Sequence, residues 1–367
     1  MSFSIVRERP APGGSCGNPE PPVGPGPNRL QGERSPAGEP AGEGARYRLG
    51  VISNPASGAN RRSGLKGFRR LMGEHPRLPY REVRTPADVA EALAAFDRRG
   101  VDLLAINSGD GTVQAVLTEL KRRGDAARMP ILALMNGGTT NMTHRDLGLP
   151  GRPAAALRRL LAWTERGEGE GRIVGRPVMR VDPLPAGEPV YGFFLGAAAV
   201  YRGIRFFHAR LKRVGLRGNA AHFAVFARFL WGLARRRDGI LSPATVRLRA
   251  DGRDFGRWRA FLLLATTLER LILGWRPFWA TGEAPLRVTL VKAPPAWIAA
   301  GFPALLRGRG HPRLQPERGY LSLRAAAIEL ELDDGFALDG ELFAPGGPTQ
   351  RILLRPGGLV RFLRFAP

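Results

Sequence analysis

The first half of the chain alternates between apolar runs and apolar residues at helical spacing. Two continuous apolar runs, Val101–Ile106 and Ile131–Met135, predict strands that are buried on both faces. Shorter strands are predicted at 46–53 and 80–84. Helices are predicted at about 63–73, after Thr85-Pro86 (a typical N-cap and first helical residue), and at 112–123. This alternation predicts an α/β domain with a parallel sheet and right-handed crossovers.

The pattern changes to short strands in the second half of the chain. Residues 321–324 and 328–332 alternate between apolar and polar, which is typical of half-buried strands. Further strands are predicted at 178–181, 190–197, 245–249, 258–266, 287–291 and 351–354, with 321–332 as one strand. We therefore expect a β-sandwich with helical insertions.

Composition and length suggest the domain organisation. A length of 367 residues suggests two domains. Residues 1–45 are dominated by Pro and Gly and are expected to be a disordered tail, without the apolar segment of a secretory signal. We predict an α/β domain at 46–176 and a β-sandwich domain at 177–367, with a polar linker at 166–171 between them.

Three small polar loops follow the first, third and fourth predicted strands. They are Asn54–Gly58, Asn107–Thr112 and Asn136–Asn141. In a parallel sheet, ligands bind outside the carboxyl ends of the strands. Glycines allow a phosphate to approach the backbone, and N–H groups with Thr and Asn side chains can hold its oxygens. Gly and Asn are also common in any tight loop, but three such loops at one edge favour a nucleotide site.

Charge and cysteine content narrow the function classes. The chain has 56 Lys plus Arg and 32 Asp plus Glu, a formal charge of +24. Nearly all of the positive charge is Arg, so coding bias is one explanation and an anionic partner is the other. Nucleic-acid binding has only this charge in its favour. A single cysteine excludes an intramolecular disulfide and a cysteine-based zinc site, and agrees with a reducing cytoplasm. The longest apolar stretches are too short for a transmembrane helix.

The loop sequences match an ordered set of family motifs. Asn54-Pro55-Ala56-Ser57-Gly58 matches N-P-x-S-G, and Ser108–Thr112 matches G-G-D-G-T with Ser in place of the first Gly. Residues 138–150 match G-T-x-N-x-x-x-R-x-L-G-I-P, with Leu149 in place of Ile. The chain resembles the diacylglycerol kinase catalytic-domain family, especially soluble bacterial lipid kinases related to sphingosine and ceramide kinases.

The resemblance implies a fold and a nucleotide site. It implies an α/β domain like those of NAD kinases and diacylglycerol kinases, then a β-sandwich domain, with the active site in the cleft between them. It also implies ATP and Mg²⁺ as cofactors. The residues expected at the nucleotide are Asn54, Ser57, Gly58, Thr85, Ser108, Gly109, Asp110, Gly111, Thr112, Gly138, Thr139 and Asn141.

A late acidic motif carries the expected catalytic residues. Residues 338–341 read L-D-G-E, as in the family. The resemblance implies Glu341 as the base, with Asp339 as its partner or an indirect Mg²⁺ ligand. Asp110 is a second candidate for work on the metal and phosphate. The alternative interpretation is a D-G hairpin turn with incidental charges.

Two departures from the family pattern leave the metal ligands open. Where the family often has D-D-G-x-L-D in a Mg²⁺-binding loop, residues 281–286 offer only Glu283. The usual Asp after Asn141 is Met142 here. Either change could alter the acceptor or lower activity.

Aromatic residues interleaved with Arg indicate a membrane-facing surface. The stretch from Arg202 to Arg217, the stripe Phe223, Phe226, Leu230 and Trp231, and the cluster Trp275–Trp279 carry this pattern. The alternative is core stripes with solvated basic faces. We expect the stripe around Phe223 to be core, and Trp275–Trp279 is the better interfacial candidate.

The combined expectation is an ATP-dependent lipid kinase of lipid metabolism. It would phosphorylate a diacylglycerol-like or sphingoid-like hydroxyl, in the cytoplasm and peripherally at the inner membrane surface. Alternatives are a weak or inactive lipid- or nucleotide-binding relative, and an NAD-kinase-like enzyme with a soluble substrate. No nucleic-acid partner is expected, and a homodimer stays open.

Overall fold

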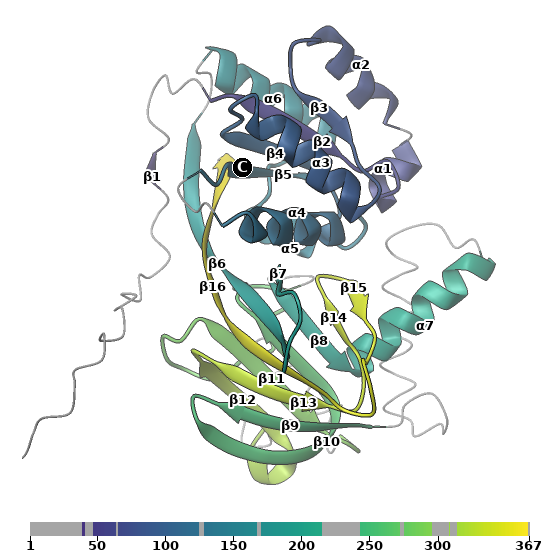
Figure 1. Cartoon of the computed structure of the whole chain (residues 1–367), viewed down its shortest axis with the longest axis vertical. Helices are drawn as coiled ribbons and strands as arrows, with labels where there is room; N and C mark the ends of the chain where they lie inside the picture. Colours follow the sequence, from purple (N-terminus) through teal and green to yellow (C-terminus); the bar gives the residue numbers. More distant parts are fainter. Residues whose placement is uncertain are drawn as a thin grey trace, which may run out of the picture. The chain divides into compact units, whose positions relative to one another are not determined.

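The computed structural model in Figure 1 describes most of the chain. It describes residues 39–40, 47–63, 65–124, 128–166, 170–214, 243–271, 275–295, 308 and 314–365, without the side chains of 39–40 and 207–214. Met1–Glu33 and Arg34–Pro367 are separate units, and all that follows concerns the second. Most of the predicted tail, the middle of the predicted linker and the stripe at 223–231 lie outside the described residues.

One piece of the predicted tail forms structure. Glu39–Pro40 is a short strand, β1, which pairs with Ile173 and Arg172 of strand β6 (Gly171–Leu184). These two residues of the predicted tail are thus part of a sheet, because the edge of β6 supplies their backbone partners. Disorder over the rest of 1–45 stays a prediction.

A parallel sheet forms the centre of the first part. Its strands are β2 (Leu49–Ser53), β3 (Tyr80–Glu82), β4 (Leu103–Ser108) and β5 (Ile131–Asn136), in the order β5-β4-β2-β3. Its helices are α1 (Gly58–Ser63), α2 (Lys66–Glu74), α3 (Pro86–Asp97), α4 (Asp110–Arg122), α5 (Met142–Leu147) and α6 (Pro153–Arg166). The predicted α/β part with a parallel sheet is confirmed.

Alternate strand residues bury the two faces of this sheet. Ile52, Leu104 and Leu134 pack in one core with residues of α3 and α4. Their neighbours Val51 and Ala105 pack in a second core with residues of α2 and α6. Both faces are covered, which is why these strands read as continuous apolar runs.

Two predicted helix starts differ in outcome. The predicted helix at 63–73 corresponds to α2, which begins only at Lys66, because Leu65 has a positive φ of 53° that separates α2 from the preceding α1. The start at Thr85 is confirmed. The Thr85 hydroxyl accepts from the Asp88 N–H at 3.2 Å, and the Asp88 carboxylate accepts from the Thr85 N–H at 3.0 Å, which forms a capping box.

The second part is rich in antiparallel strands. Besides β6 they are β7 (Val190–Gly192), β8 (Phe194–Ala198), β9 (Ala244–Ala250), β10 (Arg253–Thr266), β11 (Leu286–Lys292), β12 (Tyr320–Ala325), β13 (Ile328–Leu332), β14 (Phe336–Leu338), β15 (Glu341–Phe343) and β16 (Gln350–Phe365). Helix α7 (Ala199–Val214) follows β8 directly, and a 3₁₀ turn spans Pro316–Arg318. The predicted β-rich C-terminal region is confirmed.

The single strand predicted at 321–332 is two strands with different partners. Strand β12 pairs with β11, whereas β13 pairs with β9 and β16. The break falls at Ala326 and Ala327, whose N–H groups are both accepted by the Asp251 carboxylate at 2.8–3.1 Å. A side chain from the β9–β10 turn thus ends the strand that the alternation alone would continue.

Two long strands run through both parts of the fold. The chain of β16 pairs with β13 near Leu354 and runs parallel to β5 at Phe362, and β6 pairs along β16 (Figure 1). The predicted domain boundary at 176 lies inside β6. The α/β sheet and the β-rich region therefore share strands as well as a linker.

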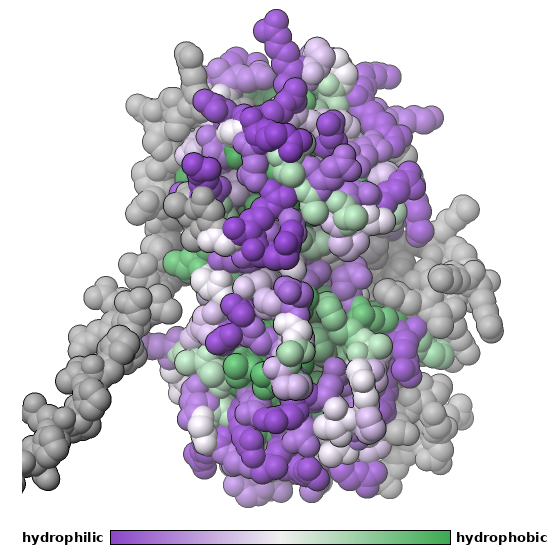
Figure 2. Space-filling view, viewed as in Figure 1, coloured by the Kyte–Doolittle hydropathy of each residue, from purple (hydrophilic) through white to green (hydrophobic). Residues whose placement is uncertain are grey.

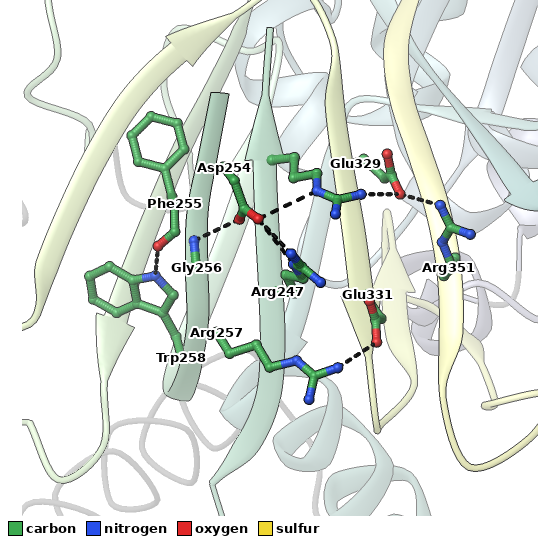
Figure 3. Close-up of polar contacts among 10 residues, drawn as sticks. Arg247, Asp254, Phe255, Gly256, Arg257, Trp258, Glu329, Glu331 and Arg351 are labelled. Atoms are coloured by element: carbon green, nitrogen blue, oxygen red, sulfur yellow. Dashed lines mark hydrogen bonds and ion pairs between the residues drawn. The ribbon is translucent and has the colours of Figure 1, made fainter. Parts of the chain in front are cut away.

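Much of the arginine charge on the outer β-face is paired. Figure 3 shows cross-strand ion pairs among β9, β10, β13 and β16. Arg247 binds Asp254 at 2.7 Å, Arg351 binds Glu329 at 2.5 Å, and Arg257 binds Glu331 at 3.3 Å. We call these residues the ion-pair ladder. Such exposed pairs contribute little stability, and because each pair is neutral, the net charge of +24 resides on other residues.

Two observations concern contact with a membrane. No described helix has the length and apolarity needed to cross a bilayer. On the face drawn in Figure 2, hydrophilic side chains cover most of the α/β part, and hydrophobic ones gather over the β-rich part.

Candidate functional site

The first predicted loop is tied to the second. The Asn54 side-chain amide donates to the Thr112 hydroxyl at 2.9 Å, and the Ser57 hydroxyl accepts from the Gly109 N–H at 3.2 Å. The Asn54 side-chain oxygen also accepts from the Ala56 N–H at 2.9 Å, which shapes the turn. The structure thus brings these predicted residues together at the carboxyl ends of β2 and β4.

Asn60 joins the first loop to the others, and the sequence argument missed it. Its side-chain amide donates to the carbonyls of Asn54 and Asn107 at 2.9 Å each, and its backbone N–H donates to the Gly137 carbonyl at 3.1 Å. The side chain is 1% exposed. Asn has a low intrinsic helix propensity, so its place inside a short helix was the one sequence feature that could have indicated a role for Asn60.

Glycines allow the loops to approach one another closely. A Cβ on Gly138 would lie 2.4 Å from the Gly109 Cα, and a Cβ on Gly58 would lie 1.7 Å from the Thr139 hydroxyl oxygen. Asn141 adopts a φ of 50°, and its side chain accepts from the Gly138 N–H at 2.9 Å. The second and third loops therefore pack backbone to backbone, as phosphate-binding loops do when their N–H groups converge.

Two other residues predicted at the nucleotide, Ser108 and Thr85, have side chains that make local hydrogen bonds in the structure. Ser108, which replaces the first Gly of the family motif, has no positive φ, and its hydroxyl donates to the Gly109 carbonyl at 3.1 Å. The replacement therefore costs no backbone strain. Thr85 is exposed and caps α3, and no hydrogen bond among the described residues joins it to the three loops.

Asp110 links the second loop to the third. Its two carboxylate oxygens accept from the N–H groups of Met142 and Thr143, at 2.9 and 3.0 Å. Burial raises the pKa of Asp110 above its usual value. The Met142 side chain is 4% exposed and lies in the core that α3 and α4 share. At the position where the family usually has Asp, this chain therefore buries a thioether.

One histidine of the third motif lies inside the fold. The His144 ring packs against Gly148, where a Cβ would lie 2.1 Å from the ring, and its Nε2 is 2.9 Å from the Leu149 carbonyl oxygen. Burial lowers the pKa of His144.

The L-D-G-E motif is a tight hairpin between β14 and β15. Asp339 and Gly340 both have positive φ, 49° and 92°, which identifies a type I′ turn. The turn interpretation is thus correct for the backbone. The charges are not incidental, however, because Asp339 is 3% exposed and its carboxylate accepts from the N–H groups of Phe193 and Phe194 at 2.9 Å each.

The surroundings of Asp339 disfavour the charged form of its carboxyl group. Burial, and secondly the charge of Asp110, raises the pKa of Asp339 to about 8, while the two N–H donors oppose that rise. The coupling places Asp110 and Asp339 within electrostatic reach of each other. Two of the three acidic residues named from the sequence therefore interact.

Glu341 completes this acidic site. It is exposed, and a Cβ on Gly111 would lie 2.1 Å from its Oε1. Its carboxylate therefore lies against the second loop at the first turn of α4, although 230 residues separate the two positions. A further link, from the Tyr191 N–H to the Thr118 hydroxyl at 3.0 Å, ties β7 to α4. The sequence argument missed Thr118.

The carboxylates fit Mg²⁺ only together with a phosphate. Among the described residues, no three His, Cys, Asp or Glu side chains group as metal ligands. Mg²⁺ is commonly held by one or two carboxylates plus substrate phosphates and water. Asp110 and Glu341, beside the three loops, match that donor set.

The loop at 281–286 does not fit a divalent cation. The Arg324 Nε donates to the Ala284 carbonyl oxygen at 2.8 Å, so this carbonyl already has a guanidinium as its partner. Glu283 is exposed, and its charge acts on Arg324, whose pKa is lowered mainly by burial. The sequence left open whether Glu283 replaces the carboxylates of the family's Mg²⁺-binding loop, and no group of three possible metal ligands forms here among the described residues.

The candidate membrane-facing cluster is partly core. Trp279 packs against the cluster that includes Phe261 and Tyr320, and Phe278 packs against the core beneath α4. Arg276 is exposed and Trp275 is half-buried. Phe278 and Trp279 are half-buried as well, so Arg276 is the one exposed residue from 275 to 279.

Comparison with known proteins agrees with these motifs. Residues 48–167 match the family model of the diacylglycerol kinase catalytic domain. No protein of curated function matches the chain.

Solved structures share the fold over most of the chain. Crystal structures of a Bacillus anthracis str. Sterne protein assigned to the diacylglycerol kinases align with 21%, 20% and 19% identity and TM-scores of 0.56, 0.55 and 0.52. Each alignment covers 87% of this chain and 97% of the other. Residues 48–167, which carry the three loops, thus match the diacylglycerol kinase catalytic-domain model, and the chain shares its fold with these structures.

Proposed function

We propose that the protein is an ATP-dependent kinase that transfers the γ-phosphoryl group to a lipid hydroxyl. One observation carries this proposal: Glu341 lies against Gly111, at the first turn of α4 and beside the three glycine-bearing loops. The family of residues 48–167 supports the phosphotransferase class.

The geometry supports specific roles in such a transfer. The acceptor hydroxyl oxygen would form a bond to the γ-phosphorus as the bond from that phosphorus to the β–γ bridging oxygen breaks, and ADP would leave. Glu341 would accept the hydroxyl proton, because it is an exposed carboxylate beside the phosphate loops. Backbone N–H groups of the loops and of the start of α4 would hold phosphate oxygens.

Mg²⁺ would supply charge neutralisation on the phosphates when bound, with Asp110 as its protein ligand, which leaves Glu341 to act as the base. Asp339 would not reach substrate. Both of its carboxylate oxygens accept backbone N–H groups, so it would hold the hairpin that carries Glu341.

A lipid acceptor is the finer part of the proposal. Its support is the family model that residues 48–167 match and the exposed Arg276 beside the half-buried Trp275, which would contact an anionic leaflet at the cytoplasmic face of the inner membrane. Trp275→Ala should weaken sedimentation with phosphatidylserine vesicles, whereas phosphatidylcholine vesicles should bind little. Unchanged sedimentation of Trp275→Ala would remove this surface from the proposal.

Radiolabelled ATP with a panel of diacylglycerol-type and sphingoid-type lipids tests the function. Wild type should label at least one lipid, and Asp110→Ala and Glu341→Ala should not. If no lipid is labelled although ATP binds, the protein is an inactive relative. If NAD is labelled instead, the acceptor is soluble.

A further inference from the structure

The strand that carries Glu341 depends on its neighbours for its position. Strand β15 has three residues and pairs only with β14, at the end of the described sheet. An isolated hairpin of this size is marginally stable in water. Where Glu341 lies is therefore decided by what holds β14.

The base of the hairpin is anchored to helix α7 by a buried ion pair. The Arg202 Nε donates to the Asp334 carboxylate at 2.6 Å, and the other Asp334 oxygen accepts from the Gly335 N–H at 2.9 Å. The side chains of Arg202 and Asp334 are 19% and 10% exposed. Pairs this sheltered are much more costly to break than surface pairs, because one charge is then left buried.

Aromatic packing closes the same end of the hairpin. The rings of Phe336 and Phe343 stack with centroids 4.9 Å apart. A Cβ on Gly335 would lie 2.3 Å from the Tyr201 ring, so α7 packs directly on the start of β14. Figure 1 shows α7 beside β14 and β15. The tip is held separately, by Asp339 on the N–H groups of Phe193 and Phe194.

We propose that Arg202 and Asp334 are positioning residues that set the reach of Glu341 toward Gly111. This inference rests on the proposed function, in which Glu341 acts on the acceptor hydroxyl. Neither residue touches the three phosphate loops by any contact among the described residues. Their loss should therefore change the transfer step and spare nucleotide binding.

The experiment compares Arg202→Met and Asp334→Asn with matched variants of the ion-pair ladder, Arg257→Met and Glu331→Gln. A displacement of about 1 Å at a reacting group can cost about 10²-fold in rate. Both hairpin variants should lower kcat at least about tenfold with ATP KM changed less than about twofold, and the ladder variants should match wild type. The double variant should lose no more than the worse single variant, because the pair acts as a unit.

Hydrogen exchange of the amides in 337–342 gives a readout that does not need activity. Exchange there should be faster in both hairpin variants and unchanged in the ladder variants. If Asp334→Asn does not fold, Arg202→Met decides alone.

Two outcomes separate the claims. An active wild type whose hairpin variants keep full kcat overturns the inference and leaves the function standing. A wild type that labels no lipid removes the proposed function, and exchange then decides the inference: unchanged exchange at 337–342 overturns it, and faster exchange supports Arg202–Asp334 as the anchor.

Discussion

At the scale of single residues, the site depends on places where a side chain has no room. A Cβ on Gly111 would meet the Glu341 carboxylate, whereas a Cβ on Gly138 would meet the Gly109 backbone. The first contact joins the loop to the proposed base, and the second joins two phosphate loops. Substitutions of the two glycines should therefore impair different steps, one phosphoryl transfer and the other ATP binding.

Gly111→Ala should lower phosphoryl transfer by about 10²-fold while ATP still binds, because Glu341 is pushed away. Gly138→Ala should weaken ATP binding itself, since the loops must separate. Gly67→Ala is the matched control, because a Cβ there meets nothing within 4 Å. Equal effects of Gly111→Ala on ATP binding and on transfer would argue against this division of roles.

The raised pKa of Asp339 predicts that the stability of the fold depends on pH. Its pKa is raised from 3.8 to about 8, so the folded state holds a proton that the unfolded state loses above pH 3.8. Stability should therefore fall as pH rises from about 4 to about 8 and level off above that range. Urea unfolding of wild type and Asp339→Asn across this range measures the effect. A slope that is the same in both proteins would exclude Asp339 as its source.

At the scale of elements, the cap of α3 gives a clean stability prediction. Thr85→Ala removes the hydroxyl that accepts from Asp88 and should cost about 1 kcal/mol of unfolding free energy, whereas Thr85→Ser should cost little. Thermal unfolding checks both. If Thr85→Ala also abolishes ATP binding while Thr85→Ser does not, the hydroxyl contacts nucleotide as the family resemblance implies.

The loop at 281–286 gives a metal-removal prediction. Because Arg324 donates to Ala284, the loop should stay ordered without a divalent cation. Adding a chelator to the nucleotide-free protein should leave the melting temperature unchanged, and Arg324→Met should lower it. A chelator-induced drop in melting temperature that disappears in Glu283→Gln would instead indicate a cation on this loop.

Elements were predicted well where the signal is local. Thr85-Pro86 and the apolar runs of β4 and β5 specify their structure within a few residues of sequence. The break between β12 and β13 was missed because Asp251, from another turn, ends the strand. Strands β14 and β15 of the hairpin at 336–343 were not predicted, because each is only three residues long.

At the scale of the whole molecule, strands β6 and β16 join the α/β sheet to the β-rich region. Each was predicted as a four-residue strand, because Pro and Gly residues interrupt its apolar pattern. The motifs predicted which loops meet at the sheet edge. They did not reveal Asn60, Thr118 or the Arg202–Asp334 pair, because those contacts join positions far apart in sequence.

The charge of the molecule also has a structural meaning. Some of the arginines lie in the ion-pair ladder, where carboxylates on neighbouring strands pair with them. Other arginines are internal, such as the buried Arg176, which binds Asp146 and Glu269 at 3.3 and 3.1 Å. Because the net charge of +24 already subtracts these paired carboxylates, the excess positive charge lies on other residues of the chain.

The central claim is that Glu341, brought from the β-rich region to the phosphate loops, accepts the proton of the acceptor hydroxyl. The most direct measurement is kcat for lipid phosphorylation by Glu341→Gln beside the ladder control Glu331→Gln, with the ATP dissociation constant of each. The structure predicts a loss of about 10²–10⁴-fold in kcat for Glu341→Gln with ATP affinity retained, and no loss for Glu331→Gln. A Glu341→Gln enzyme with wild-type kcat would contradict the account.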